Sequence, residues 1–175
     1  MDETASSSAE HKGTLIVAGN DVALRHLLAT ALRDKGDIII EVGSGLSLFD
    51  ALRHLRNRNV SPSMVIVDQH LAGLTGLEVL ETIREWGWRM PVLLIASIGD
   101  DEELLRRRAL ELGADGVLDK PFDVEELRLI VRFLLRKARR TEQDTIPTRQ
   151  TNSVDAAPET NRFESGLRGA TDTAR

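Results

Sequence analysis

Residues 64–77 read MVIVDQHLAGLTGL, and this stretch decides how the rest of the chain is interpreted. The uninterrupted apolar run Met64–Val67 has the length of a strand and indicates one that is buried on both faces. Asp68 follows at the end of that run, and a short loop with two glycines leads into helical spacing over Thr75–Trp86. A buried strand, a polar loop and an amphipathic helix in this order predict an α/β unit.

The same alternation extends from about residue 14 to residue 140. Apolar runs predict strands at Thr14–Ala18, Asp37–Val42, Met64–Val67, Pro91–Ile95 and Gly116–Leu118. Apolar residues at helical spacing predict helices at Asp21–Lys35, Ser47–Asn57, Thr75–Trp86, Asp100–Leu112 and Asp123–Arg140. Five strands alternating with five helices predict an α/β fold with a single doubly wound, five-stranded parallel sheet.

The two ends of the chain differ from this central part. We expect one domain at 14–140, a disordered N-terminal tail at 1–13 and a disordered polar C-terminal tail at 141–175. Neither end has enough apolar residues to offset the entropy of ordering. Residues 13–140 carry 18 basic and 19 acidic side chains, so no general attraction to nucleic acid is expected.

Several classes of protein are excluded by what the sequence lacks. There is no cysteine, which rules out a disulfide framework, a thiol nucleophile and a zinc–thiolate site. No apolar run approaches the roughly 20 residues that a membrane-spanning helix needs, and residues 1–12 lack the apolar stretch of a secretory signal. We therefore expect a cytoplasmic protein with no membrane partner.

Polar residues follow three of the predicted strands, and in a doubly wound sheet the carboxyl ends of the strands border the functional crevice. Asp68 follows the third strand, Lys120 the fifth, and Asn20 and Asp21 follow the first. A carboxylate facing an ammonium group can act as a nucleophile toward phosphorus while the lysine balances the transferred charge. The favoured interpretation of Asp21 is a cap on the first helix.

Two segments resemble motifs of response-regulator receiver domains, the signalling modules of two-component systems. DQHLAGLTGL at 68–77 is similar to the phosphoacceptor loop, and GADGVLDKPF at 113–122 is similar to the Lys-Pro segment. The resemblance covers about 14–139 and implies the flavodoxin-like strand order 2-1-3-4-5. It also implies that Asp68 is the phosphoacceptor, that Lys120 contacts a phosphoryl oxygen, and that the Lys120–Pro121 peptide bond is cis.

The chain departs from the family pattern at the metal site and at the switch. The resemblance places the two metal-holding acids at Gly19 and Asn20. The candidate Mg²⁺ ligands are then Asn20, Asp68 and the backbone carbonyl of His70, with weakened affinity because Mg²⁺ usually relies on carboxylates. Ala96 stands where the family has a hydroxyl residue and Val117 where it commonly has an aromatic one, so both switch positions are degenerate. This combination is typical of a divergent or pseudo-receiver.

The resemblance implies a stand-alone bacterial receiver domain without enzymatic activity, which signals by protein–protein contact in a phosphorelay. Two versions remain open. Asp68 accepts a phosphoryl group from a histidine kinase or phosphotransfer protein, or the domain is a phosphorylation-independent adaptor. The downstream protein would contact the last two helices. A flavin-binding or hydrolytic enzyme on the same fold is the rival hypothesis, but no phosphate-binding loop or nucleophile elbow is visible.

Overall fold

Five short apolar runs form one parallel sheet in the computed structural model, which describes residues 13–34, 36–97 and 102–144. The strands are β1 (Thr14–Ala18), β2 (Ile38–Val42), β3 (Met64–Asp68), β6 (Val92–Ser97) and β7 (Gly116–Lys120). Their order in the sheet is β2-β1-β3-β6-β7, and all neighbours are parallel. Since β6 and β7 are the fourth and fifth of the predicted strands, this is the order 2-1-3-4-5, and the predicted topology is confirmed.

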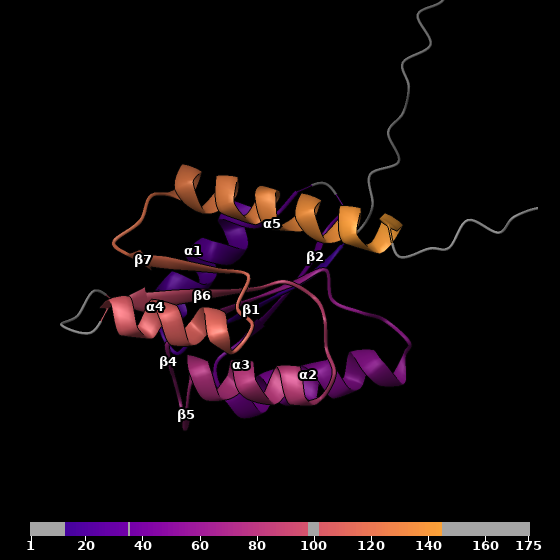
Figure 1. Ribbon diagram of the computed structural model, residues 1–175, viewed down its shortest axis with the longest axis horizontal. Coiled ribbons are helices and arrows are strands. Elements are labelled where there is room, and N and C mark those ends of the chain that lie inside the picture. Colours follow the sequence, from indigo (N-terminus) through magenta and orange to yellow (C-terminus); the bar gives the residue numbers. More distant parts are fainter. Residues whose placement is uncertain (1–12, 35, 98–101, 145–175) are drawn as a thin grey trace, which may run out of the picture.

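The helices cover both faces of this sheet (Figure 1). They are α1 (Val22–Leu32), α2 (Gly45–Asn57), α3 (Gly76–Glu85), α4 (Glu102–Glu111) and α5 (Val124–Asp144). One core cluster joins the sheet to α2, α3 and α4, and a second joins it to α1 and α5. Successive residues of β3, such as Val65 and Ile66, belong to different clusters. The strands therefore read as continuous apolar runs because both of their faces are buried.

Local sequence signals account for the starts of α1 and α3. The Asp21 carboxylate caps α1 by accepting hydrogen bonds from the backbone N–H groups of Ala23 and Leu24, as predicted. Thr75 caps α3 in a capping box with Glu78. Helix α5 continues to Asp144, four residues beyond the predicted end at Arg140, because no helix breaker stands in that interval.

Part of the expectation falls outside the described residues. This applies to residues 1–12 and 145–175 of the two predicted tails and to the first residues of the helix predicted from Asp100. A two-stranded hairpin, β4 (His70–Leu71) and β5 (Leu74–Thr75), was not predicted, because strands of two residues show no periodicity. None of the helices that the structure describes has the length and apolar character needed to cross a membrane.

Candidate functional site

Asp68 is the last residue of β3, and its carboxylate lies at the edge of the sheet where the strands end. Its side chain is only 5% exposed, and it is the one charged residue in the buried class within the described part of the chain. A carboxylate is rarely buried so deeply unless it is paired. Two donors satisfy it: the backbone N–H of His70 donates to Oδ1 at 3.0 Å, and Lys120 Nζ donates to Oδ2 at 2.6 Å.

Lys120 reaches Asp68 from β7, the edge strand, across the end of β6. Asp68 pairs with Ile95 in the β3–β6 ladder, and Lys120 pairs with Ser97 in the β6–β7 ladder. The sheet therefore brings together the two residues that the sequence singled out, although 52 positions separate them. The Lys120–Pro121 peptide bond is cis, the isomer that the resemblance implies.

Two glycines shape the loop that follows Asp68. Gly73 lies in the hairpin turn with a φ of +81°, a conformation that side chains other than glycine rarely adopt. A Cβ atom at Gly76 would lie 2.5 Å from Leu94 Cδ1 and 2.9 Å from the backbone oxygen of Asp68. The Gly-x-x-Gly spacing is thus explained by one tight turn and by one close approach of the chain beneath Asp68.

The end of β1 has no carboxylate facing Asp68. A Cβ atom built on Gly19 would lie 3.8 Å from the Cβ atom of Asp68, so this position points toward the phosphoacceptor candidate but has no side chain to offer. Asn20 is exposed, and the Asp21 carboxylate is already engaged in capping α1. Asp68 and Lys120 therefore form a charge-balanced pair, and the two metal-holding acids that the family has at positions 19 and 20 are absent.

These residues do not fit an ordinary Mg²⁺ site. Mg²⁺ needs a near-octahedral shell of oxygen ligands and usually takes one or two of them from carboxylates. Of the candidates, Asp68 already accepts two hydrogen bonds, and Asn20 carries a neutral amide. The backbone carbonyl of His70 remains a ligand implied by the resemblance alone. The described residues contain no group of three or more His, Cys, Asp or Glu side chains placed to hold a metal ion.

The two degenerate switch positions are packed into the body of the domain. Ala96 is fully buried on β6, and its methyl group can donate no hydrogen bond. Val117 on β7 packs against the core cluster beneath α2, α3 and α4. Neither residue offers a hydroxyl or an aromatic ring that could respond to a change at Asp68.

An ion pair that sequence reasoning missed connects α4 to β7 next to these positions. Arg106 Nη2 pairs with the carboxylate of Asp119, and Glu102 lies 3.9 Å away on the same helix. Asp119 stands opposite Ala96 in the β6–β7 ladder, and its Oδ1 is buried without a hydrogen-bond partner. A run of three arginines such as 106–108 is typical of a solvated helix face, but Arg106 is turned inward to β7.

A second arginine that sequence reasoning missed fixes the loop after β1. Arg25 on α1 donates from Nη1 to the backbone oxygen of Gly19 at 2.6 Å, and its Nε lies 3.8 Å from Glu41 on β2. The side chain of Arg25 is 15% exposed. A partly buried cation therefore stands next to the position where a metal-binding acid would be expected, which makes this end of the crevice still less suited to Mg²⁺.

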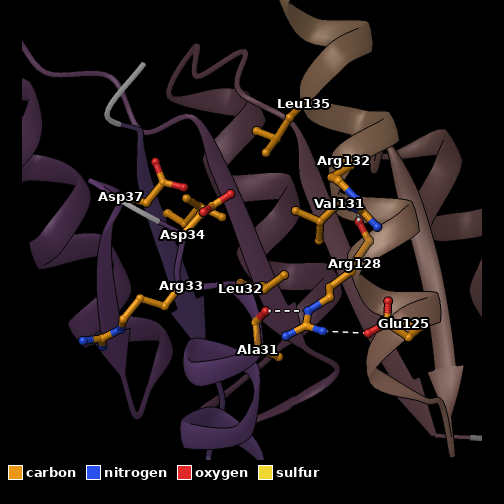
Figure 2. Close-up of a pocket in the computed structure, with 11 residues that line it drawn as sticks. Ala31, Leu32, Arg33, Asp34, Asp37, Glu125, Arg128, Val131, Arg132 and Leu135 are labelled. Carbon is orange, nitrogen blue, oxygen red and sulfur yellow. Dashed lines mark hydrogen bonds and ion pairs between the residues drawn. The ribbon is translucent and has the colours of Figure 1, made fainter. Parts of the chain in front are cut away.

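A cavity in the described part of the domain lies away from the Asp68–Lys120 pair. Figure 2 shows it between α1 and α5, with a volume of about 360 Å³. Its lining includes Leu15, which pairs with Met64 at the start of β3, whereas Asp68 ends that strand. Arg128 on its wall donates to the backbone oxygen of Ala31 and to Glu125, which ties α5 to α1 (Figure 2). The cavity is therefore near the amino ends of the strands, whereas the Asp68–Lys120 pair lies at their carboxyl ends.

The chain is similar in sequence to known regulatory proteins. Two transcriptional regulatory proteins, TctD of Salmonella typhimurium and the CpxR homolog of Haemophilus influenzae, are each 34% identical to the chain over 124 residues. The match covers 71% of this chain and 52% and 51% of those proteins. The chain thus spans about half the length of the curated relatives it matches.

Solved structures show the same fold. NtrX from Brucella abortus superposes with a TM-score of 0.67 at 24% identity, covering 77% of this chain and 30% of that one. The receiver domain of the Francisella response regulator 1452 superposes with a TM-score of 0.61 at 24% identity, covering 73% and 99%. The family model described as the response regulator receiver domain matches residues 15–132. The chain therefore belongs to the response regulator receiver domain family.

Proposed function

We propose that this receiver domain signals through protein–protein contact without a metal-assisted phosphorylation switch, and that the Asp68–Lys120 pair is a fixed part of its structure. The observation that carries the proposal is the position of Gly19, which has no side chain although a Cβ atom built on it would lie 3.8 Å from the Cβ atom of Asp68. An ordinary site would place a carboxylate there to hold Mg²⁺. The charge-balanced pair has no excess negative charge with which to attract a divalent cation.

The packing around Ala96 and Val117 supports the same proposal. Phosphorylation can change the shape of a domain only if some group makes different contacts in the two states. A methyl group at Ala96 makes no hydrogen bond to a phosphoryl group, and Val117 is partly buried and packs against the core. A phosphoryl group on Asp68 would therefore lack the usual partners for rearranging α4.

A second candidate function is favoured by one observation, the 2.6 Å contact between Lys120 Nζ and Asp68 Oδ2. In this version an Asp68 oxygen attacks the phosphorus of a donor, the bond from phosphorus to the donor's leaving group breaks, and Lys120 balances charge on the transferred group. A histidine kinase or a phosphotransfer protein would then be the upstream partner.

Intact mass spectrometry distinguishes the two functions. The protein is incubated with a small acyl phosphate, with and without Mg²⁺, beside its Asp68→Asn variant. The proposal predicts no phosphoryl adduct on the parent protein, with or without Mg²⁺, and none on Asp68→Asn. An added mass of about 80 Da, one phosphoryl group, that is absent from Asp68→Asn would contradict it and support the second candidate. Gly19→Asp/Asn20→Asp serves as the matched variant in which the missing acids are restored.

We propose that the downstream protein contacts α4 and α5. The domain is proposed to act in the cytoplasm and to have no enzymatic activity. Neither DNA contact nor a membrane partner is part of the proposal for this domain, because its basic and acidic residues nearly balance over 13–140. The flavin or hydrolase hypothesis gains no support from the cavity between α1 and α5, since ligands of doubly wound folds bind at the carboxyl ends of the strands. Because a bound flavin is yellow, we expect the purified protein to be colourless.

A further inference from the structure

The cavity between α1 and α5 carries opposite charges on its two sides (Figure 2). Asp34 and Asp37 belong to the loop between α1 and β2, whereas Arg128 and Arg132 lie on α5. The apolar part of the lining comes from the core cluster that joins the sheet to α1 and α5, and consists of Leu15, Leu32, Val131 and Leu135. The volume of about 360 Å³ exceeds the roughly 150 Å³ of a cavity that holds benzene, so a phenyl ring has room there.

The charge that is left without an ion pair among the described residues differs in sign between the two sides. Arg128 and Glu125 neutralise each other through an ion pair of 2.6 Å. Arg132 donates from Nε to the backbone oxygen of Arg128 but forms no ion pair within the described ranges. Asp37 Oδ1 accepts a hydrogen bond from a backbone N–H group, which leaves its negative charge in place. The side chain of Arg33 extends away from the other labelled residues (Figure 2). An occupant that fits this cavity therefore needs an acid facing α5, an apolar centre and a base facing the loop before β2.

One segment of this chain has side chains in that order. Residues 162–164 read Arg-Phe-Glu, and Phe163 is the only aromatic residue after Phe133. The other large apolar residues after position 144 do not lie between a base and an acid; they are Ile146, Val154 and Leu167. Residues 1–12 contain no Phe, Leu, Ile or Val. The sequence therefore indicates 162–164 as the segment that matches the cavity.

We propose that residues 162–164 bind in the cavity of their own domain. The phenyl ring enters the apolar centre, as in interfaces with an apolar core and a polar rim. Glu164 then faces Arg132 on α5, and Arg162 faces Asp37 on the other side of the cavity. The inference goes beyond the proposed function, because it assigns a contact within the chain, and it does not depend on the chemistry of the phosphoacceptor candidate.

The length of the intervening chain allows this contact. Leu135, which lines the cavity, lies nine residues before Asp144, the last residue of α5, and so about 14 Å from it along the helix. The 17 residues 145–161 can span up to about 55 Å. A tether of this length holds the segment at an effective concentration on the order of 1 mM. A contact that is weak between separate molecules is therefore populated within one molecule, which is the reason to favour this chain's own segment over that of another protein.

Paramagnetic relaxation in NMR tests the proposal, and the absence of cysteine from the chain allows a single label to be attached at a chosen position. A nitroxide on Ser165→Cys in the full chain should broaden the amide signals of Leu32 and Val131. Phe163→Ser in the same labelled chain should lower the ratio of bound to unbound segment at least about tenfold, as expected when the burial of one Phe side chain is lost. Leu80, which belongs to the core cluster on the other face of the sheet, supplies the reference signal.

A mixed sample identifies the molecule that provides the segment. Isotope-labelled chain without a nitroxide is combined with spin-labelled chain of natural isotope abundance, so that broadening arises only between molecules. No broadening is expected at the same total protein concentration. Broadening in the mixed sample would assign the contact to a second copy and overturn the proposal. An absence of broadening in the first sample, or broadening that Phe163→Ser leaves unchanged, would overturn it as well.

A charge exchange tests the orientation of the segment. Glu164→Arg and Arg132→Glu should each reduce the broadening, because each places like charges together, whereas the double variant should restore it. The matched controls are Glu159→Arg, in the same part of the chain, and Arg136→Glu, at an exposed position of α5 outside the cavity lining; both should leave the broadening unchanged. A double variant no better than the singles, or controls with equal effects, would overturn the proposal. Circular dichroism checks that the α5 variants are folded. Asp68→Asn should bind its segment like the parent, so the outcome is separate from the mass-spectrometry test of Asp68.

Discussion

Replacing Lys120 with methionine should destabilise the domain substantially, because it leaves a lone carboxylate in a buried position. Asp68 is 5% exposed, and Lys120 is its only cationic partner among the described residues. Breaking a fully buried ion pair costs about 3–5 kcal/mol. Lys120 is 27% exposed and the His70 N–H group remains in place, so water and that donor reduce the expected loss to about 2–3 kcal/mol.

Urea unfolding measures this loss. With a slope of about 2 kcal/mol per molar urea, Lys120→Met should lower the midpoint by about 1–1.5 M. Asp68→Asn should cost less, because its amide oxygen can still accept from His70 N–H and Lys120 can still reach water. In the double variant no charge is left buried, so it should recover most of the loss, with a coupling of about 2 kcal/mol. A midpoint for Lys120→Met within about 0.3 M of the parent, a loss of less than about 0.6 kcal/mol, would refute the reasoning.

Three further predictions concern other charged residues of the domain. Arg84 on α3 donates to the backbone oxygens of Gly113, Trp88 and Met90 and to the Asp115 carboxylate, and burial lowers the pKa of its guanidinium although Asp115 opposes this. Arg84→Met should therefore cost about 3–5 kcal/mol in urea unfolding, whereas Arg89→Met, at an exposed neighbour, should change stability by less than about 0.5 kcal/mol. Arg106→Met should cost about 1 kcal/mol, since Arg106 is partly exposed, and should speed amide exchange in α4 and β7; equal exchange in Arg106→Met and Arg107→Met would contradict this. Hydrogen bonds from the Thr75 backbone and side chain lower the pKa of Glu78 below its ordinary 4.5. Its stabilisation of the domain should accordingly be complete above pH 4.5 and be lost as pH falls through the lowered value, and Glu78→Gln should remove that part of the pH dependence of the urea midpoint.

The sequence was most informative where one kind of residue repeats along a short stretch. The apolar runs located all five strands of the sheet to within two residues at either end, because a strand buried on both faces needs no partner information to be recognised. The Asp21 cap was also predictable, since capping depends on residues only two or three positions away. The strand order 2-1-3-4-5 came from the resemblance to receiver domains.

What the sequence could not show are contacts between distant residues. Arg106 and Asp119, and Arg25 and the Gly19 carbonyl, meet only after the sheet and helices have formed. Their side chains have no periodic signal, and both arginines stand in segments that read equally well as solvated helix faces. Asp68 and Lys120 could be predicted because charged residues at the ends of buried strands are informative. Their direct ion pair could be seen only in the structure.

The space beside Gly19 has a consequence for engineering. Nothing lies closer than 3.8 Å to a Cβ atom built there, and the Arg25 contact holds the loop by its backbone and not by a side chain at position 19. The receiver domain therefore lacks a carboxylate at position 19 but has room for one. A cation site could be installed by exchanging side chains alone, which makes this chain a host in which metal dependence can be added to a receiver one carboxylate at a time.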